Sequence, residues 1–130
     1  MRVLLDTQCW LWMTLCPERF SPSARALVES RETILYFSAA SAWEIAIKHA
    51  LGKLRLPEPP AAYVPGRVAA LGVQPLPIEQ QHALHVATLP AHHRDPFDRL
   101  LIAQAQLEDL AILTADPVFP AYDVPTIAAQ

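Results

Sequence analysis

The stretch "DPFDRLLIAQAQLEDLAILTAD", residues 95–116, decides the fold class of this chain. Asp95 is suited to cap a helix, and Pro96 suits the first helical position, where a missing N–H costs nothing. The largely apolar run that follows predicts a helix through residue 110. "AILTAD", residues 111–116, then predicts a short buried strand ended by an aspartate. A helix that leads straight into such a strand is typical of chains that build a parallel sheet.

The rest of the chain alternates between strand and helix patterns in the same way. The middle helix, residues 41–54, is expected to begin at a capping box of Ser41 and Glu44 and to end at Gly52. The other expected elements are a strand at 2–5, helices at 8–15 and 21–31, a strand at 33–38, a helix at 66–72, a strand at 73–78, a helix at 79–89 and an edge strand at 124–128. We therefore expect an α/β fold in which helices cover both faces of a parallel sheet.

Length and composition limit the classes of protein to consider. A chain of 130 residues is the size of one domain, and we expect a single domain over residues 1–130. No apolar run approaches the roughly 20 residues that cross a bilayer, and the opening residues do not form a secretory signal, so we expect a cytoplasmic protein without membrane contact. The net charge of −3 gives no general attraction to nucleic acid, so a polyanionic substrate needs a local basic patch or bridging cations.

Four acidic residues interrupt apolar context near the ends of expected elements: Asp6, Glu44, Asp98 and Asp116. In a parallel α/β sheet, the carboxyl ends of the strands and the starts of the following helices share one rim, where ligands bind. Taken singly, helix capping is favoured over a catalytic role for Glu44, Asp98 and Asp116. Asp6 is harder to explain in this way, because an unpaired carboxylate in apolar surroundings is costly.

Taken together, the four acids favour a metal site. Carboxylates that converge on one point repel one another and raise each other's pKa values unless a cation neutralises them. Oxygen ligands without a cysteine or paired-histidine motif favour Mg²⁺ or Mn²⁺. Such ions activate water at neutral pH and stabilise the leaving oxygen of a phosphodiester, so hydrolysis of phosphodiester bonds is the expected chemistry.

Several segments together resemble a known family over essentially the whole chain. They are "LLDTQCWLWM" (4–13), "SAASAWEIAIKHALGKLRLP" (38–57), "LPAHHRDPFDRLLIAQA" (89–105), and "ILTAD" (112–116) followed by "FPAYDVP" (119–125). In this order and spacing they resemble the PIN-domain ribonucleases, especially the VapC-like toxins of bacterial type II toxin–antitoxin pairs. The resemblance implies a three-layer α/β/α fold with a central, mainly parallel sheet and an endoribonuclease activity that depends on Mg²⁺ or Mn²⁺.

The resemblance also assigns residues and partners. The four acidic positions of the family fall on Asp6, Glu44, Asp98 and Asp116, which are thereby implied to be catalytic and to bind the metal. Asp95 fits the family's "RDPFDR" signature, although its position favours capping over a role at the metal. The implied partners are an RNA substrate, a cognate antitoxin protein and a second copy of the chain in a homodimer.

Basic and aromatic residues leave alternatives open. The basic residues near the acid-bearing helices either contact RNA phosphates or form a solvated face; they are Lys48, His49, Lys53, Arg55, His92, His93, Arg94 and Arg99. The run "HHR" lacks the ligand spacing of a zinc site. For Trp10, Trp12 and Trp43, packing in the core or in a dimer is favoured over base stacking.

Two rival functions are compatible with the same acids. A Mg²⁺-dependent phosphatase or phosphotransfer domain would use Asp6 as a nucleophile, but Gln8 stands where that class usually has a second aspartate. A non-catalytic module would use the acidic rim to dock a basic partner peptide, and it predicts neither metal binding nor toxicity on expression.

Overall fold

The computed structural model describes residues 1–130. The strands are β1 (Arg2–Leu5), β2 (Ile34–Ser38), β3 (Gln74–Leu76), β4 (Ala111–Thr114) and β5 (Thr126–Ala128). The helices are α1 (Thr7–Leu15), α2 (Pro22–Glu29), α3 (Ala39–Ala50), α4 (Pro60–Ala70), α5 (Gln80–His85) and α6 (Pro96–Glu108). Short 3-10 turns lie at Pro17–Arg19, Val86–Thr88 and Phe119–Ala121. None of these helices is long and apolar enough to cross a membrane.

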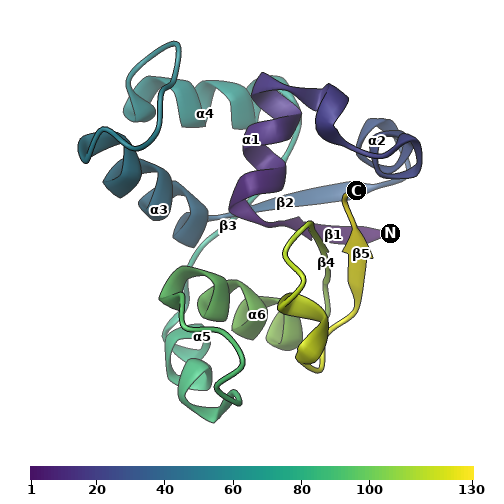
Figure 1. Cartoon of the computed structure of the whole chain (residues 1–130), viewed down its shortest axis with the longest axis vertical. Coiled ribbons are helices and arrows are strands. Elements are labelled where there is room, and N and C mark those ends of the chain that lie inside the picture. Colours follow the sequence, from purple (N-terminus) through teal and green to yellow (C-terminus); the bar gives the residue numbers. More distant parts are fainter.

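The five strands form one parallel sheet in the order β3-β2-β1-β4-β5. The first strand is central, and its Val3 lies opposite Leu35 of β2 and Ala111 of β4. Helices α1, α2 and α4 lie on one side of the sheet and α5 and α6 on the other (Figure 1). The expected three-layer α/β/α fold with a parallel sheet is therefore confirmed. Because all strands run in one direction, their carboxyl ends meet at a single rim.

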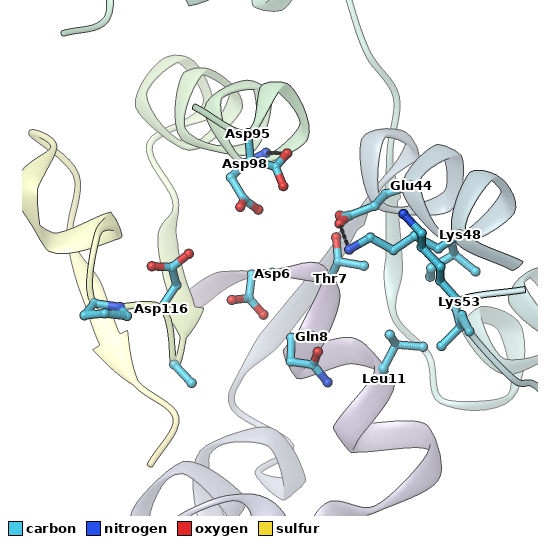
Figure 2. Close-up of a pocket in the computed structure, with 14 residues that line it drawn as sticks. Asp6, Thr7, Gln8, Leu11, Glu44, Lys48, Lys53, Asp95, Asp98 and Asp116 are labelled. Carbon is cyan, nitrogen blue, oxygen red and sulfur yellow. Dashed lines mark hydrogen bonds and ion pairs between the residues drawn. The ribbon is translucent and has the colours of Figure 1, made fainter. Parts of the chain in front are cut away.

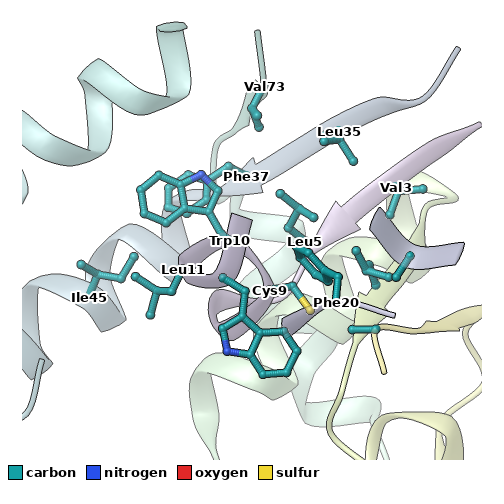
Figure 3. Packing of buried hydrophobic residues seen from close by; sticks show 14 of the residues in the cluster. Val3, Leu5, Cys9, Trp10, Leu11, Phe20, Leu35, Phe37, Ile45 and Val73 are labelled. Atoms are coloured by element: carbon teal, nitrogen blue, oxygen red, sulfur yellow. The ribbon is translucent and has the colours of Figure 1, made fainter. Parts of the chain in front are cut away.

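Alternate residues of β1 face the two hydrophobic cores. Val3 and Leu5 belong to one cluster, and Leu4 belongs to the other. Trp10 of α1 fills the first cluster, where its ring centroid lies 4.6 Å from that of Phe37 (Figure 3). The β1 strand thus reads as a continuous apolar run because both of its faces are covered.

The tryptophans divide between core and surface. Trp10 and Trp12 are buried, as the preference for packing predicts. Trp43 is different, because its side chain is 57% exposed and packs edge-to-face on Phe97 of α6. It is therefore not a core residue within this chain.

Helix α3 begins earlier than expected. Its cap is Ser38, the last residue of β2, whose hydroxyl accepts a hydrogen bond from the N–H of Ala40. The predicted capping box at Ser41 and Glu44 is wrong, because β2 leads into the helix without a loop and both residues lie inside the helix. The predicted end at Gly52 is confirmed by its left-handed φ of 73° just after the last turn.

Two other expected helices also differ from the structure. Helix α4 begins at Pro60, six residues before the expected start, and continues through Pro65. Pro60 occupies the first helical position without cost, and Pro65 removes one backbone hydrogen bond. The helix expected at 79–89 is broken into α5 and the 3-10 turn at Val86–Thr88.

Candidate active site

All four predicted acids lie in one pocket at the carboxyl rim of the sheet. The pocket has a volume of about 600 Å³, and its acidic lining residues are Asp6, Glu44, Asp95, Asp98 and Asp116. They come from different elements: Asp6 follows β1, Glu44 lies on α3, Asp98 is in the first turn of α6, and Asp116 follows β4. Their carboxylates point toward a common space (Figure 2).

Asp6 is held rigidly where β1 meets α1. Its side chain is buried and accepts hydrogen bonds of 2.6 Å from the N–H of Cys9 and of 2.6 Å from the hydroxyl of Thr114. Burial raises the pKa of this carboxyl, and the hydrogen bonds from Thr114 and Cys9 act in the opposite direction. Asp6 therefore caps α1 and at the same time presents a fixed carboxyl to the pocket.

Glu44 carries the least satisfied group in the pocket. Its residue is 4% exposed, and one carboxylate oxygen, Oε2, lies 2.6 Å from the ammonium of Lys48. The other oxygen, Oε1, is buried and has no hydrogen-bond partner. A buried polar atom without a partner is costly and calls for an explanation, which a bound cation would supply.

The start of α6 contributes two carboxylates with different tasks. Asp95 caps the helix as predicted, because its Oδ1 accepts from the N–H of Phe97 at 2.8 Å and of Asp98 at 3.3 Å. Asp98 has a pKa raised to about 7, first by burial and then by the negative charges of Asp95 and Glu44. The repulsion expected among converging acids thus contributes to the raised pKa of Asp98.

Asp116 does not cap a helix, so the capping interpretation of this residue is wrong. The next helical turn, Phe119–Ala121, is preceded by Val118, and Asp116 instead closes a tight turn by accepting from the N–H of Val118 at 2.8 Å. Its own N–H donates to the hydroxyl of Thr114. Thr114 thereby joins Asp116 and Asp6.

His93 belongs to the site, although the sequence placed it only among the basic residues. Its Nε2 lies 2.9 Å from Asp116 Oδ2 and 3.0 Å from Asp98 Oδ2. No sequence signal pairs a loop histidine with acids 5 and 23 positions away. Only the packing of α6 beside β4 brings the three together.

Three of the other basic residues have positions that indicate their roles. Lys48 and Lys53 line the pocket and add positive charge beside the acids. Arg99 instead donates to the carbonyl oxygens of Pro90 and Val86, at 2.9 and 3.0 Å. Arg99 therefore fixes the loop before α6 through these backbone contacts.

The donor set of this pocket fits a hard divalent cation. It offers carboxylate oxygens from four elements, one of them the unpartnered Oε1 of Glu44. It contains no thiol, because Cys9 and Cys16 do not line it. Carboxylate-rich sites of this kind suit Mg²⁺ and Mn²⁺.

Comparison with known proteins identifies the family. The family model of the PIN domain matches residues 3–125. The chain belongs to the PIN domain family. Among curated proteins, this PIN domain is 49% identical over 61 residues to Ribonuclease VapC16 of Mycobacterium tuberculosis. That match covers 47% of the chain and 43% of the length of VapC16.

Solved structures share the fold of this PIN domain at low sequence identity. VapBC2 from Rickettsia felis, bound to a DNA fragment from its promoter, matches with a TM-score of 0.72 and 12% identity over 100% of both chains. DNA-bound VapBC from Salmonella typhimurium matches with a TM-score of 0.72 and 18% identity over 100% of this chain and 99% of the other. FitAcB from Neisseria gonorrhoeae gives 0.62 and 20% over 96% of each chain. At these identities the likeness shows the fold alone.

Proposed function

We propose that this PIN domain is a metal-dependent endoribonuclease that hydrolyses RNA phosphodiester bonds as the toxin of a type II toxin–antitoxin pair. The observation that carries the proposal is the convergence of four carboxylates from four elements on one pocket, with a buried Glu44 oxygen left unpartnered. The partial identity to a ribonuclease of the VapC type supports the choice of RNA as substrate. In this proposal, residues 1–130 form one functional domain.

Asp6, Glu44, Asp98 and Asp116 would hold the ion, Mg²⁺ or Mn²⁺. When bound, such an ion lowers the pKa of water and stabilises negative charge on phosphate oxygens. The protein itself contributes by orienting the carboxylates that would bind the ion. Asp6 is fixed by Thr114 and by the N-terminus of α1, so its carboxylate requires little rearrangement.

Lys48 and Lys53 have a separate task at the mouth of the pocket. Their ammonium groups lie beside the acids, where they can contact the phosphates on either side of the scissile bond. A chain with a net charge of −3 needs such a local positive patch to hold RNA.

The proposed partners follow from the same surface. Solved relatives of this fold are complexes of the VapBC kind, which supports a cognate antitoxin, and the acidic pocket suits a basic segment of that protein. A homodimer is supported by a stripe of exposed apolar side chains on and just after α3, Trp43, Ile47 and Leu51. The pair would act in the cytoplasm.

The decisive experiment is cleavage of RNA by the purified protein and by Asp6→Asn. The substitution keeps the oxygen that accepts from Cys9 but removes a charge from the site, so we expect the fold to persist and cleavage to be lost. EDTA should abolish wild-type cleavage, and Mg²⁺ or Mn²⁺ should restore it. Asp123→Asn, which removes an exposed acid, is the matched control and should cleave normally.

Two results would replace the proposal by a rival. Trapping of a phosphoryl group on Asp6 would favour the phosphatase or phosphotransfer class. A wild-type protein that binds no divalent ion and is harmless on expression would favour the non-catalytic binding module.

A further inference from the structure

The imidazole of His93 is engaged on both of its nitrogens. Nδ1 accepts a hydrogen bond of 3.1 Å from the backbone N–H of Asp95. Nε2 lies 2.9 Å from Asp116 Oδ2 and 3.0 Å from Asp98 Oδ2. The ring thus connects the loop before α6, the first turn of α6 and the turn after β4.

The contact at Nδ1 decides which nitrogen carries the proton. A backbone N–H only donates, so Nδ1 must present a lone pair to Asp95. The hydrogen of the ring is then on Nε2, where it points at the two carboxylates. An Nε2 that bears a hydrogen has no lone pair for a metal. His93 therefore acts as a donor to the acids, although its distances alone are also those of a ligand cluster.

The position of the ring is fixed by its surroundings. The backbone N–H of His93 donates to the hydroxyl of Tyr122 at 2.7 Å. The ring packs edge-to-face on Phe119, with centroids 5.9 Å apart. Arg99 holds the start of the same loop through the carbonyl oxygen of Pro90. The donor is therefore in place before any ligand arrives.

We propose that His93 is a positioning residue, whose Nε2–H bridges Asp98 and Asp116 and holds their carboxylates in the arrangement that binds the divalent ion. The inference rests on the proposed function of the pocket. Two carboxylates that approach the same point repel each other, and a shared hydrogen-bond donor offsets this repulsion. Outer partners of this kind commonly set the orientation of metal-binding carboxylates.

The test compares the binding of Mn²⁺ by calorimetry in the wild type, His93→Leu and His93→Gln. We expect His93→Leu to weaken binding by about 10- to 100-fold, which is the usual cost of losing an outer-shell partner. His93→Gln should recover most of the loss, because its amide nitrogen reaches the place of Nε2. The control is His92→Gln, which removes an exposed neighbouring imidazole and should bind Mn²⁺ like the wild type.

Two further readouts separate positioning from other roles. The Mn²⁺-loaded wild type should show no directly coordinated nitrogen in electron spin-echo spectroscopy. In RNA cleavage, His93→Leu should need more Mn²⁺ for half-maximal rate but keep the KM for RNA. A coordinated nitrogen in the wild type, or unchanged Mn²⁺ affinity in His93→Leu, overturns the inference while leaving the proposed function intact. A wild type that neither binds Mn²⁺ nor cleaves RNA overturns both.

Discussion

Neutralising Asp98 should stabilise the metal-free protein while destroying its metal site. The pKa of Asp98 is raised from 3.8 to about 7, so its charged form is disfavoured in the folded state. A difference of about three pKa units corresponds to about 4 kcal/mol, since each unit contributes about 1.36 kcal/mol. The stability contributed by the protonated form is full below pH 4 and is lost as the pH rises through 7.

Asp98→Asn removes this loss because its side chain stays neutral at every pH. Asp95 and Glu44 share the electrostatic repulsion, which lowers the gain, and we expect a gain of about 2 kcal/mol at pH 8, half of the roughly 4 kcal/mol that the pKa difference allows. For a chain of this size, that gain raises the melting temperature by roughly 6–10 °C. At pH 4 the variant and the wild type should differ by less than about 1 kcal/mol, because this pH lies close to the unfolded-state pKa of Asp98 and far below its folded-state pKa.

The assay is urea and thermal unfolding in EDTA at pH 4, 6 and 8. Asp123→Asn is the matched control, since it removes one negative charge from an exposed position and leaves the pocket unchanged. The reasoning is refuted if Asp98→Asn is no more stable than Asp123→Asn at pH 8. A difference in stability between Asp98→Asn and Asp123→Asn that does not grow from pH 4 to pH 8 would refute it equally. Added Mn²⁺ should stabilise the wild type and leave Asp98→Asn unaffected.

Three other changes have definite expected outcomes. Thr114→Val removes the hydroxyl that donates to the buried Asp6, and it should cost about 1–3 kcal/mol in urea unfolding and weaken Mn²⁺ binding; an unchanged midpoint would contradict the proposed support of Asp6. Ile102→Ala leaves a cavity at a fully buried position on α6 and should cost about 2–5 kcal/mol, with RNA cleavage retained below the new melting temperature. Lys53→Ala should raise the KM for RNA and reduce the slope of log affinity against log salt by about 0.7, as loss of one phosphate contact requires; an unchanged slope would place Lys53 outside the RNA path.

The elements that local chemistry specifies were predictable from the sequence. β1 matches its expected bounds, and α6 starts where Asp95 and Pro96 predict a cap and a first helical residue. These features depend on neighbours along the chain, so a short stretch contains the information. The convergence of Asp6 and Asp116 was also predictable, because parallel strands bring their carboxyl ends to one rim.

The parts that depend on distant partners were not predictable. Ser38 and Ser41 are equally good caps by local chemistry, and the choice falls on Ser38 because β2 continues to pair with β3 up to that residue. The role of His93 depends on contacts of its ring with both Asp98 and Asp116, and no periodic pattern in the sequence predicts these contacts. Sequence patterns therefore predict the main helices and strands and the four acids, but they do not predict that His93 contacts two of these acids.

The central position of β1 has a consequence for synthesis of the protein. Asp6 is the first of the four acids to emerge from the ribosome. Strand β4, which pairs with β1, and the hydroxyl of Thr114, which donates to Asp6, come more than one hundred residues later. Asp116 arrives later still. A polypeptide that ends before residue 116 thus lacks the last of the four acids, and no such fragment is able to assemble the complete pocket. Newly made molecules acquire the pocket only after the segment that contains Thr114 and Asp116 has been translated.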